Sequence, residues 1–178
     1  HLMRTSDTLP SFFQSFYELT GNEQWLSIKE KMLSQLDAIS SQSKTGLLPD
    51  FMWVDEQGAR VADPDTIESK YDGAYSYNAC RLPYNLAQSQ DKTSQKLGKK
   101  MLDFFMKQRN IYAGYDLKGN ALHQYQAASF IAPVSYAAEN RDGYLKLVQQ
   151  NKFIFMQDLS TENYYDATMT TMIALQLF

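Results

Sequence analysis

The sequence has little of what most metal or nucleophile chemistry requires. Its 178 residues include one cysteine, Cys80, and two histidines, His1 and His123. A single cysteine excludes an internal disulfide and any site built from several thiolates. Neither histidine stands at a metal-ligand spacing with acidic residues on one helix face, and a Gly-x-Ser-x-Gly elbow and glycine-rich phosphate loops are absent. We therefore expect no metal and no cofactor.

Positive charge and long apolar runs are also scarce. The net charge is -3 at pH 7 and the pI is about 5.4, which argues against a nucleic-acid partner, because proteins that bind the phosphate backbone usually carry a basic patch. Five lysines recur along one expected helix, a pattern typical of a solvated face: Lys92, Lys96, Lys99, Lys100 and Lys107. No apolar run approaches the ~18 residues that would span a bilayer, so no membrane partner is expected.

Length and composition suit one folded domain over residues 1–178. Hydrophobic residues make up 44% of the chain, which is enough to bury a core, and the length gives no reason to invoke a second domain. No signal peptide is visible. The opening His1-Leu2-Met3 looks partly like a cut end, and a chain that begins within a longer protein would not show an N-terminal signal.

Apolar residues recur at helical spacing along nearly the whole chain. A first stripe over residues 9–17 is closed by Gly21, and Asn22 then caps a second helix with a stripe over residues 25–39. These two helices should form an antiparallel hairpin. Further helices are expected over residues 77–87, 93–108, 129–139, 142–157 and 163–178. No strand alternation of any length is visible, so we predict an all-α fold of about seven helices.

The connection over residues 47–73 is long for a compact domain, and connections of this length are uncommon unless they are functional. It carries six carboxylates that are candidates for proton transfer: Asp55, Glu56, Asp63, Asp65, Glu68 and Asp72. Aromatic residues lie in and just after the same stretch, and their rings can stack on the C–H faces of sugars. This density of acids and ring faces is what a site needs to hold a sugar and move protons beside it.

The segment after this connection, Tyr77-Asn-Ala-Cys-Arg81, resembles the Tyr-Asp-Ala-x-Arg-x-x-Trp segment of glycoside hydrolase family 8. Three further pieces follow the family's order at similar spacing. Residues 7–25 contain Asp-Thr-Leu-Pro-Ser-Phe-Phe and Thr-Gly-Asn-Glu-Gln-Trp and look like its Asn-Pro-Ser-Tyr-Phe helix. Gly46-Leu-Leu-Pro-Asp-Phe51 looks like its Gly-Leu-x-Pro-Asp-Trp, and Ala128-Ser-Phe-Ile-Ala-Pro133 looks like its Ala-Ser-Phe-Ile-Gly-Pro. Four pieces in register are hard to obtain by chance.

The resemblance implies the C-terminal half of an (α/α)6 barrel, because the family's catalytic-acid glutamate and aspartate-rich signature lie upstream of anything present here. It implies endo-acting, inverting hydrolysis of a β-linked polysaccharide, such as cellulose, xylan, chitosan or a bacterial exopolysaccharide, and a secreted or cell-envelope location. The partners would be the polysaccharide and the N-terminal half of the same barrel, without which this chain should be inactive. The alternatives are a non-catalytic carbohydrate-binding or scaffold module and a helical repeat that mediates protein contacts.

Inverting hydrolysis needs an acid for the leaving oxygen and a carboxylate that activates water, separated by about 6.5–9.5 Å. The family's general-base aspartate falls on Asn78, whose amide cannot accept a proton, and the family includes a branch in which an acid of a neighbouring inserted loop replaces it. Among the six acids we favour Asp72 as the base, because it is closest in sequence to the helix start that bears Asn78. Its alternative role is that of a carboxylate at a helix N-terminus that accepts backbone N–H groups. Arg81 would hold a carboxylate or orient Asn78, and its alternative is a structural ion pair.

The candidate substrate-binding residues are mostly aromatic. Phe12 falls where relatives carry a tyrosine near the attacking water, and Asp50 is a candidate ligand whose alternative role is a turn-stabilising contact. Five rings complete the prediction: Trp53, Tyr71, Tyr75, Tyr77 and Tyr84. Tyr125 and Tyr136 could stack on sugars as well, but helical spacing makes core packing the alternative for Tyr84 and Tyr136. His123 is expected at the surface or behind the site.

Overall fold

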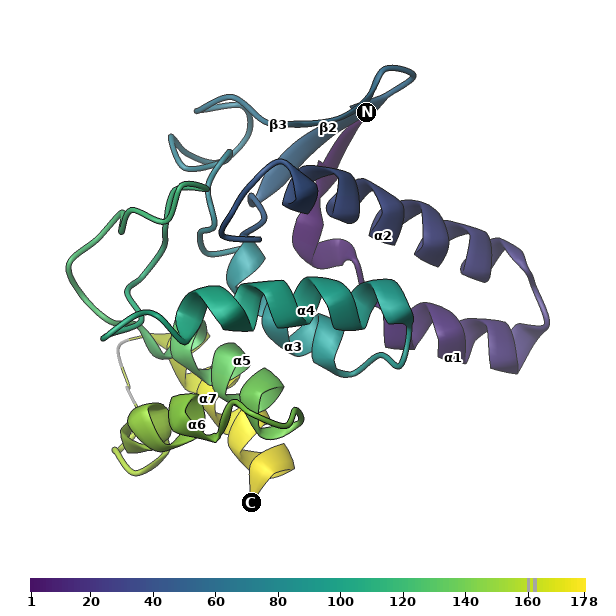
Figure 1. Ribbon diagram of the computed structural model, residues 1–178. Helices are drawn as coiled ribbons and strands as arrows, with labels where there is room; N and C mark the ends of the chain where they lie inside the picture. Colours follow the sequence, from purple (N-terminus) through teal and green to yellow (C-terminus); the bar gives the residue numbers. More distant parts are fainter. Residues whose placement is uncertain (160, 162) are drawn as a thin grey trace.

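The computed structural model describes residues 1–159, 161 and 163–178, and it is mostly helical (Figure 1). Seven α-helices lie in this part of the chain: α1 (Pro10–Thr20), α2 (Gln24–Ser41), α3 (Leu82–Ala87), α4 (Lys92–Phe105), α5 (Ala128–Glu139), α6 (Leu145–Asn151) and α7 (Tyr164–Leu177). Short 3-10 helices are η1 (Thr5–Asp7), η2 (Ala79–Arg81) and η3 (Lys152–Phe155). The predicted helical fold class is confirmed.

α1 and α2 form the antiparallel hairpin that the sequence predicts (Figure 1). Pro10 occupies the first turn of α1, where its missing N–H is not needed and its fixed φ suits a helix start. Gly21 follows the helix in the left-handed conformation, with φ 67°, and donates its N–H to the carbonyl of Tyr17 at 2.7 Å. Asn22 Oδ1 then accepts the N–H of Gln24 at 3.0 Å, where α2 starts. Local sequence therefore specifies this turn.

A small antiparallel sheet corrects the expectation of a chain without strands. Its strands lie in the order β1 (Leu2–Arg4), β2 (Phe51–Asp55) and β3 (Gly58–Val61). Leu2 lies opposite Trp53, and Met52 lies opposite Val61. The strands have 3, 5 and 4 residues, which is too short for a period of two to stand out, and β1 pairs with a segment that follows only after α1 and α2. Part of the connection over residues 47–73 is therefore a hairpin.

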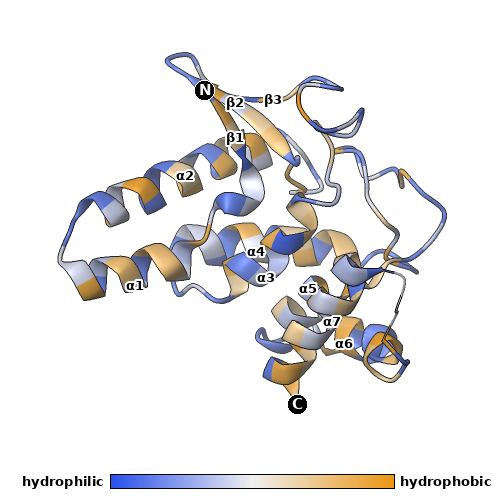
Figure 2. Ribbon diagram, turned by 180° about the vertical axis from the view of Figure 1, so that it is seen from behind, coloured by the Kyte–Doolittle hydropathy of each residue, from blue (hydrophilic) through white to orange (hydrophobic). Residues whose placement is uncertain are grey.

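The core lies where α5 meets its neighbours. α5 packs against α7, α3 and α6, while α4 packs against α2 and α3, so the elements run from the α1–α2 hairpin at one end to α5–α7 at the other (Figure 1 and Figure 2). Phe130, Ile131 and Val134 of α5 are almost fully buried, and Tyr75 and Phe105 add large rings to the same cluster. The segment Ala-Ser-Phe-Ile-Ala-Pro therefore belongs to a helix with little exposed surface.

Two predicted helices are each interrupted. Residues 77–87 form η2 followed by α3, and residues 142–157 contain α6 followed by η3. Among the described residues, no helix combines the length and the apolar character needed to cross a bilayer. The same part of the chain contains no group of three or more His, Cys, Asp and Glu side chains that could hold a metal ion.

Candidate active site

The loop before η2 and the start of the chain bring four side chains into one hydrogen-bonded series. Glu68 Oε2 accepts an N–H of Asn78 Nδ2 at 2.8 Å, and Glu68 Oε1 accepts an N–H of Arg4 Nη2 at 2.9 Å. Asn78 Oδ1 in turn accepts an N–H of Arg81 Nη2 at 2.9 Å. Because arginine offers only donors, the carbonyl oxygen of Asn78 must face Arg81 and its amide nitrogen must face Glu68. The partners of Asn78 thus fix the orientation of its amide.

These side chains line an open hollow of about 490 Å³. Its walls are formed by Arg4, Glu68, Tyr77, Asn78, Arg81, Asn163 and Tyr165. The side chain of Glu68 is 44% exposed, so water can reach the carboxylate. Each Glu68 oxygen uses one lone pair in the bonds to Asn78 and Arg4 and keeps a second for another donor. The hollow therefore presents an accessible carboxylate beside an amide and two guanidinium groups.

Arg81 ties this group to the start of the chain. Its Nη2 also donates to Ser6 Oγ at 2.7 Å, and its Nε donates to the backbone carbonyl of Asn78 at 3.3 Å. The ion pairs found among the described residues do not include Arg81. Arg81 thus makes the forked contact that would orient Asn78, and its part in catalysis stays a prediction.

Asp72 is buried beneath the loop that carries Glu68. It is 1% exposed, and its two oxygens accept the backbone N–H groups of Ile67, Glu68 and Ser69 at 2.6–3.3 Å. A carboxylate that is closed off from solvent and surrounded by donors of its own loop has no access to an attacking water. The burial of Asp72 therefore argues against its prediction as the base, and its oxygens hold the loop that presents Glu68.

Asp50 is a second buried carboxylate behind the site. It is 4% exposed, and its Oδ1 accepts the N–H groups of Ser76 at 3.0 Å and Ala79 at 2.7 Å. Burial raises the pKa of Asp50 from 3.8 to about 6, and backbone N–H groups, that of Ala79 foremost, oppose the shift. Since Ala79 begins η2, Asp50 anchors the turn that carries Asn78 and Arg81. The prediction of Asp50 as a sugar ligand is corrected, because the carboxylate is not accessible to a sugar.

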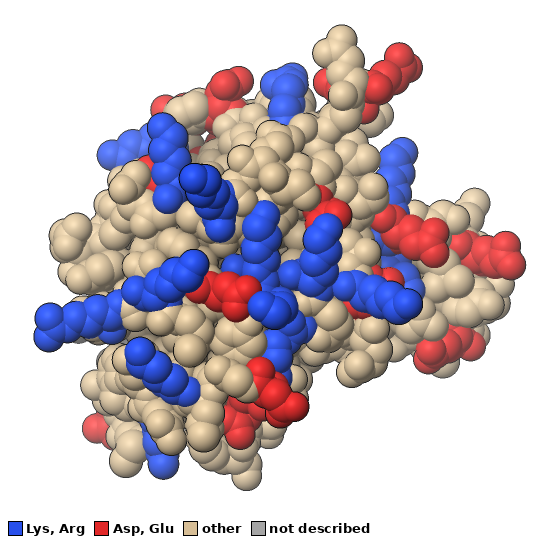
Figure 3. Space-filling view, in the orientation of Figure 1, with Lys and Arg blue, Asp and Glu red and all other residues tan. Residues whose placement is uncertain are grey.

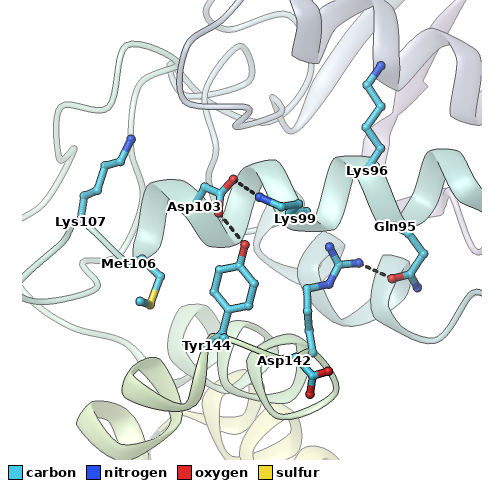
Figure 4. Close-up of a pocket in the computed structure, with 10 residues that line it drawn as sticks. Gln95, Lys96, Lys99, Asp103, Met106, Lys107, Asp142 and Tyr144 are labelled. Carbon is cyan, nitrogen blue, oxygen red and sulfur yellow. Dashed lines mark hydrogen bonds and ion pairs between the residues drawn. The ribbon is translucent and has the colours of Figure 1, made fainter.

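A larger hollow of about 830 Å³ lies between α4 and the turn after α5 (Figure 4). Lysine and arginine side chains gather on this face of the molecule (Figure 3). Asp103 in this hollow accepts bonds from Lys99 Nζ at 2.8 Å and from Tyr144 Oη at 2.5 Å, and Lys96 pairs with Asp37. None of the residues that line it belongs to the segments resembling the glycosidase family. The surface fits the solvated lysine face that the sequence predicts.

Comparisons with known proteins decide the family. Residues 3–177 match the family described as Glycosyl hydrolases family 8. The chain belongs to this family. A β-glucanase of Niallia circulans is 27% identical over 146 residues, which cover 76% of this chain and 36% of the relative. An endoglucanase of Bacillus sp. strain KSM-330 is 30% identical over 142 residues, which cover 73% of this chain and 30% of the relative. The chain thus spans about a third of the length of these relatives.

Solved family 8 structures share the fold of this chain. The apo structure of a β-1,3-1,4-glucanase from Paenibacillus sp. X4 gives a TM-score of 0.89 at 23% identity, covering 98% of this chain and 49% of that structure. A family 8 xylobiose complex from Teredinibacter turnerae gives a TM-score of 0.73 at 19% identity, covering 98% and 45%. The chain therefore corresponds to about half of a family 8 (α/α)6 barrel.

Tyr77 is the predicted aromatic residue that lines the hollow of this family 8 chain. It is 37% exposed, and its ring lies edge-on to Phe130 with centroids 5.0 Å apart. Tyr165, which the sequence analysis missed, lines the same hollow and donates its hydroxyl to the backbone carbonyl of Tyr77 at 3.0 Å. Burial raises the pKa of both phenols. Both hydroxyls therefore act as neutral donors and acceptors near neutral pH.

Two of the predicted aromatic residues, Tyr75 and Tyr84, pack in or against the hydrophobic core. Tyr75 is fully buried, with the rings of Phe105 and Phe130 at 5.7 and 5.9 Å, so it cannot stack on a sugar and that prediction is corrected. Tyr84 lies edge-on to Tyr136 at 4.8 Å. This pair shows the packing role that was the alternative for both residues.

Three predicted residues lie outside the lining of the hollow. Phe12 is 50% exposed on α1. The guanidinium of Arg60 lies 5.3 Å from the ring centre of Trp53, and the Lys70 ammonium lies 5.0 Å from that of Tyr71. Each cation covers one face of its ring. The contacts of these three residues with a sugar stay predictions.

Sequence reasoning missed two residues of the hollow, Arg4 and Tyr165, and both contact it from distant parts of the chain. Arg4 meets Glu68 across 64 residues, and Tyr165 meets Tyr77 across 88 residues. No local spacing signals such contacts. Glu68 stood among the candidate acids, but the choice between it and Asp72 depends on which carboxylate the loop turns outward.

Proposed function

We propose that this chain forms one side of the active site of an endo-acting, inverting glycosidase that hydrolyses a β-linked polysaccharide, with Glu68 as the general base. The observation that carries the proposal is the 2.8 Å contact between Glu68 and Asn78, which places an accessible carboxylate beside the position where the family usually has its aspartate. The names of the relatives, β-glucanase and endoglucanase, favour a β-glucan as the substrate. Xylan, chitosan and bacterial exopolysaccharides are the other polymers of this class.

In the proposed reaction, a water held by Glu68 attacks the anomeric carbon and gives its proton to the carboxylate. The bond from water oxygen to carbon forms as the bond from carbon to the glycosidic oxygen breaks, which inverts the configuration. Asn78 and Arg4 each donate to one oxygen of Glu68, so the carboxylate is held in one orientation with lone pairs left for the water. Tyr77 and Tyr165 supply ring surface and hydroxyls at the wall of the hollow.

The leaving oxygen needs a proton from a second carboxyl group. Glu68 is the one carboxylate among the described residues that line the hollow. We propose that the acid comes from the remaining half of the barrel, which would also cover apolar side chains that are exposed on α1 and α7: Phe12, Phe16, Leu19, Tyr164 and Leu175.

The enzyme is proposed to act outside the cytoplasm, because a polysaccharide does not cross membranes unaided.

Substitution of Glu68 tests the proposal. In the full-length gene product, Glu68→Gln should lower kcat by about 10²–10⁴-fold with KM nearly unchanged, because the amide keeps the shape of the side chain but cannot accept the proton. Glu68→Ala should be partly rescued by azide, which can occupy the vacated space and form a glycosyl azide of inverted configuration. The matched control is Asp63→Asn, an exposed acid of the same loop, which should change kcat less than about twofold. Unchanged turnover in Glu68→Gln would refute the assignment.

The second candidate function is a non-catalytic carbohydrate-binding module. Asn78 favours it, because an amide stands where the family has a proton acceptor. The unsubstituted protein distinguishes the two candidates. A binding module would be retarded in a gel that contains a β-linked polysaccharide and would release no reducing sugar from that polysaccharide. Measurable release that Glu68→Gln abolishes would support the enzyme.

A further inference from the structure

The last residue of β1 contacts the carboxylate that lines the hollow. Arg4 Nη2 donates to Glu68 Oε1 at 2.9 Å, although 64 positions of sequence separate the two residues. Asn78 holds the other carboxylate oxygen, Oε2, at 2.8 Å. The side chains of Arg4 and Glu68 are 39% and 44% exposed, so their contact lies at the surface of the hollow. Each oxygen of Glu68 is therefore held by a residue from a different part of the chain.

An aromatic ring lies against the guanidinium group of Arg4. The central carbon of the guanidinium lies 5.4 Å from the ring centre of Phe51. Arg4 and Phe51 are directly opposite in the pairing of β1 with β2, and opposite residues of antiparallel strands project their side chains from the same face. Phe51 is 2% exposed, so its ring is held by its neighbours. Because a planar cation is attracted to such a ring, Phe51 restricts the positions that the guanidinium can take.

The backbone that carries Arg4 is bound on both sides. β1 pairs with β2 along its whole length. Thr5 donates its N–H to the carbonyl of Asp50 at 3.0 Å and its hydroxyl to the carbonyl of Pro49 at 2.5 Å. These contacts fix the point from which the Arg4 side chain starts. The remaining freedom of Arg4 is that of its side-chain torsions, which the contacts with the ring and the carboxylate restrain.

Arg4 makes the contact with Glu68 at a cost to the stability of the fold. Its Nε is buried and has no hydrogen-bond partner among the described residues. A buried donor without a partner lacks the bond that water would give it in the unfolded chain. The ion pair with Glu68 compensates only weakly, because exposed ion pairs contribute little to stability. An arrangement that stabilises the fold so weakly, at the one carboxylate among the described residues that line the hollow, indicates a role in function.

We propose that Phe51 and Arg4 are a positioning pair for Glu68: the ring orients the guanidinium, and the guanidinium orients the carboxylate that receives the proton. The inference rests on the proposed function of Glu68. Both a positive charge and a planar group are needed at position 4, because the charge binds the carboxylate and the plane stacks on the ring. The pair acts on the reaction through Glu68, so its loss should lower kcat and leave KM nearly unchanged.

The first test is the kinetics of the full-length gene product on a soluble β-glucan. Arg4→Ala should lower kcat by about 10- to 100-fold, since a displacement of about 1 Å at a reacting group can cost that much, with KM within about twofold. Arg4→Lys should recover only part of the loss, because an ammonium group keeps the charge and lacks the planar fork. Phe51→Leu keeps an apolar side chain, removes the ring face and should lower kcat by about 3- to 10-fold.

Arg60 and Trp53 provide the matched control. They form the same kind of contact on β3 and β2, with the Arg60 guanidinium 5.3 Å from the ring centre, but neither lines the hollow. Arg60→Ala should therefore change kcat less than about twofold. Added guanidinium ion, below denaturing concentrations, should restore part of the kcat of Arg4→Ala and less when Phe51→Leu is also present. Thermal unfolding shows whether each variant is folded, and the Arg4 variants decide the proposal if Phe51→Leu unfolds.

A double substitution separates the positioning pair from the assignment of the base. In the Glu68→Gln protein, Arg4→Ala should lower kcat by less than about a further twofold, because no base remains to be positioned. The full loss in that background, or normal kcat in folded Arg4→Ala, would overturn the positioning pair and leave Glu68 as the base. A higher KM with unchanged kcat would also overturn it, because Arg4 would then bind the sugar directly. Normal kcat in Glu68→Gln alone would overturn the base itself.

Discussion

Glu68 and Asp72 belong to one loop, yet their surroundings differ completely. Asp72 is 1% exposed and accepts three backbone N–H groups, whereas the side chain of Glu68 is 44% exposed and is held by the side chains of Asn78 and Arg4. Both carboxylates are satisfied, but only that of Glu68 can still meet water. The comparison shows that, in this loop, the carboxylate bound to backbone N–H groups is closed off from solvent and the carboxylate bound to side chains stays accessible to water.

Asp50 extends the comparison to the turn that carries Asn78. Like Asp72 it is buried and bound to backbone N–H groups, and together the two acids fix the loop and η2 on either side of the 2.8 Å contact between Glu68 and Asn78. Two buried carboxylates thus support one exposed carboxylate. The contrast between buried and exposed carboxylates predicts that substitutions of Asp50 or Asp72 act on stability first, and that substitution of Glu68 acts on turnover first.

The largest effect on stability is expected from the ionisation of Asp50. Its pKa is about 6 in the folded protein and 3.8 ordinarily, so between about pH 4 and pH 6 the folded state keeps a proton that the unfolded state releases. Folding is therefore less favourable as pH rises, by about 3 kcal/mol once the pH exceeds the folded pKa. Asp50→Asn removes this titration. The difference in unfolding free energy, wild type minus variant, should fall by that amount between about pH 4 and pH 7 in urea titrations.

An exposed acid gives the control for this experiment. Asp63→Asn should show a difference from wild type that stays nearly constant over the same pH range, because Asp63 is exposed on the loop. A flat difference for Asp50→Asn would show that the Asp50 carboxylate is not buried as the structure has it.

The next effect separates Asp72 from Glu68 directly. Asp72→Asn replaces an acceptor oxygen by an amide that faces backbone donors, so it should lower the free energy of unfolding by about 1–3 kcal/mol and reduce turnover as the loop moves. Glu68→Gln should change the unfolding free energy by less than about 1 kcal/mol, because the bond from Arg4 to Glu68 is an exposed ion pair. Equal losses of stability in the two variants, measured by urea unfolding at pH 7, would contradict the contrast between buried Asp72 and exposed Glu68.

The helical part of the fold could be predicted from the sequence because its signals are local. Gly21 ends α1 with a positive φ, and Asn22 bonds to Gln24 two residues on, so both positions are readable from neighbouring residues. The strands could not be predicted in the same way. β1 is formed by pairing with β2, across α1 and α2, and no pattern within three residues reveals a partner so distant.

The sequence pointed to the segments of the candidate site and not to the contacts between its side chains. The family-like segments place Asn78 and Arg81 in the site, and the structure shows them hydrogen-bonded to each other. The prediction of Asp72 rested on closeness in sequence to Asn78, whereas the acid that contacts Asn78 in the structure is Glu68. Two contacts, one short-range and one long-range, hold Glu68 beside Asn78: Asp72 accepts the backbone N–H of Glu68, and Arg4, near the start of the chain, donates to the Glu68 carboxylate.

The smallest effect is expected at Asn78 itself. Asn78→Asp would place a second carboxylate at the 2.8 Å contact with Glu68, and like charges at that distance raise the pKa of both groups. The pair would then share a proton near neutral pH and lose the amide donor that holds Glu68. We expect kcat at pH 7 to fall by about 3- to 10-fold and the acidic limb of the pH profile to move upward by about one pH unit.

Asn78→Ala is the matched control for this prediction, since it removes the donor without adding charge and should lower kcat without moving the acidic limb. Arg81 would lose one of its three acceptors in the alanine variant and would gain a charged one in the aspartate variant, so thermal unfolding should give a lower midpoint for alanine. A tenfold or larger gain in kcat for Asn78→Asp would mean that the proton acceptor had been lost from this position. In that case Glu68 would not be the base, and the division between exposed and buried carboxylates would describe only the stability of the loop.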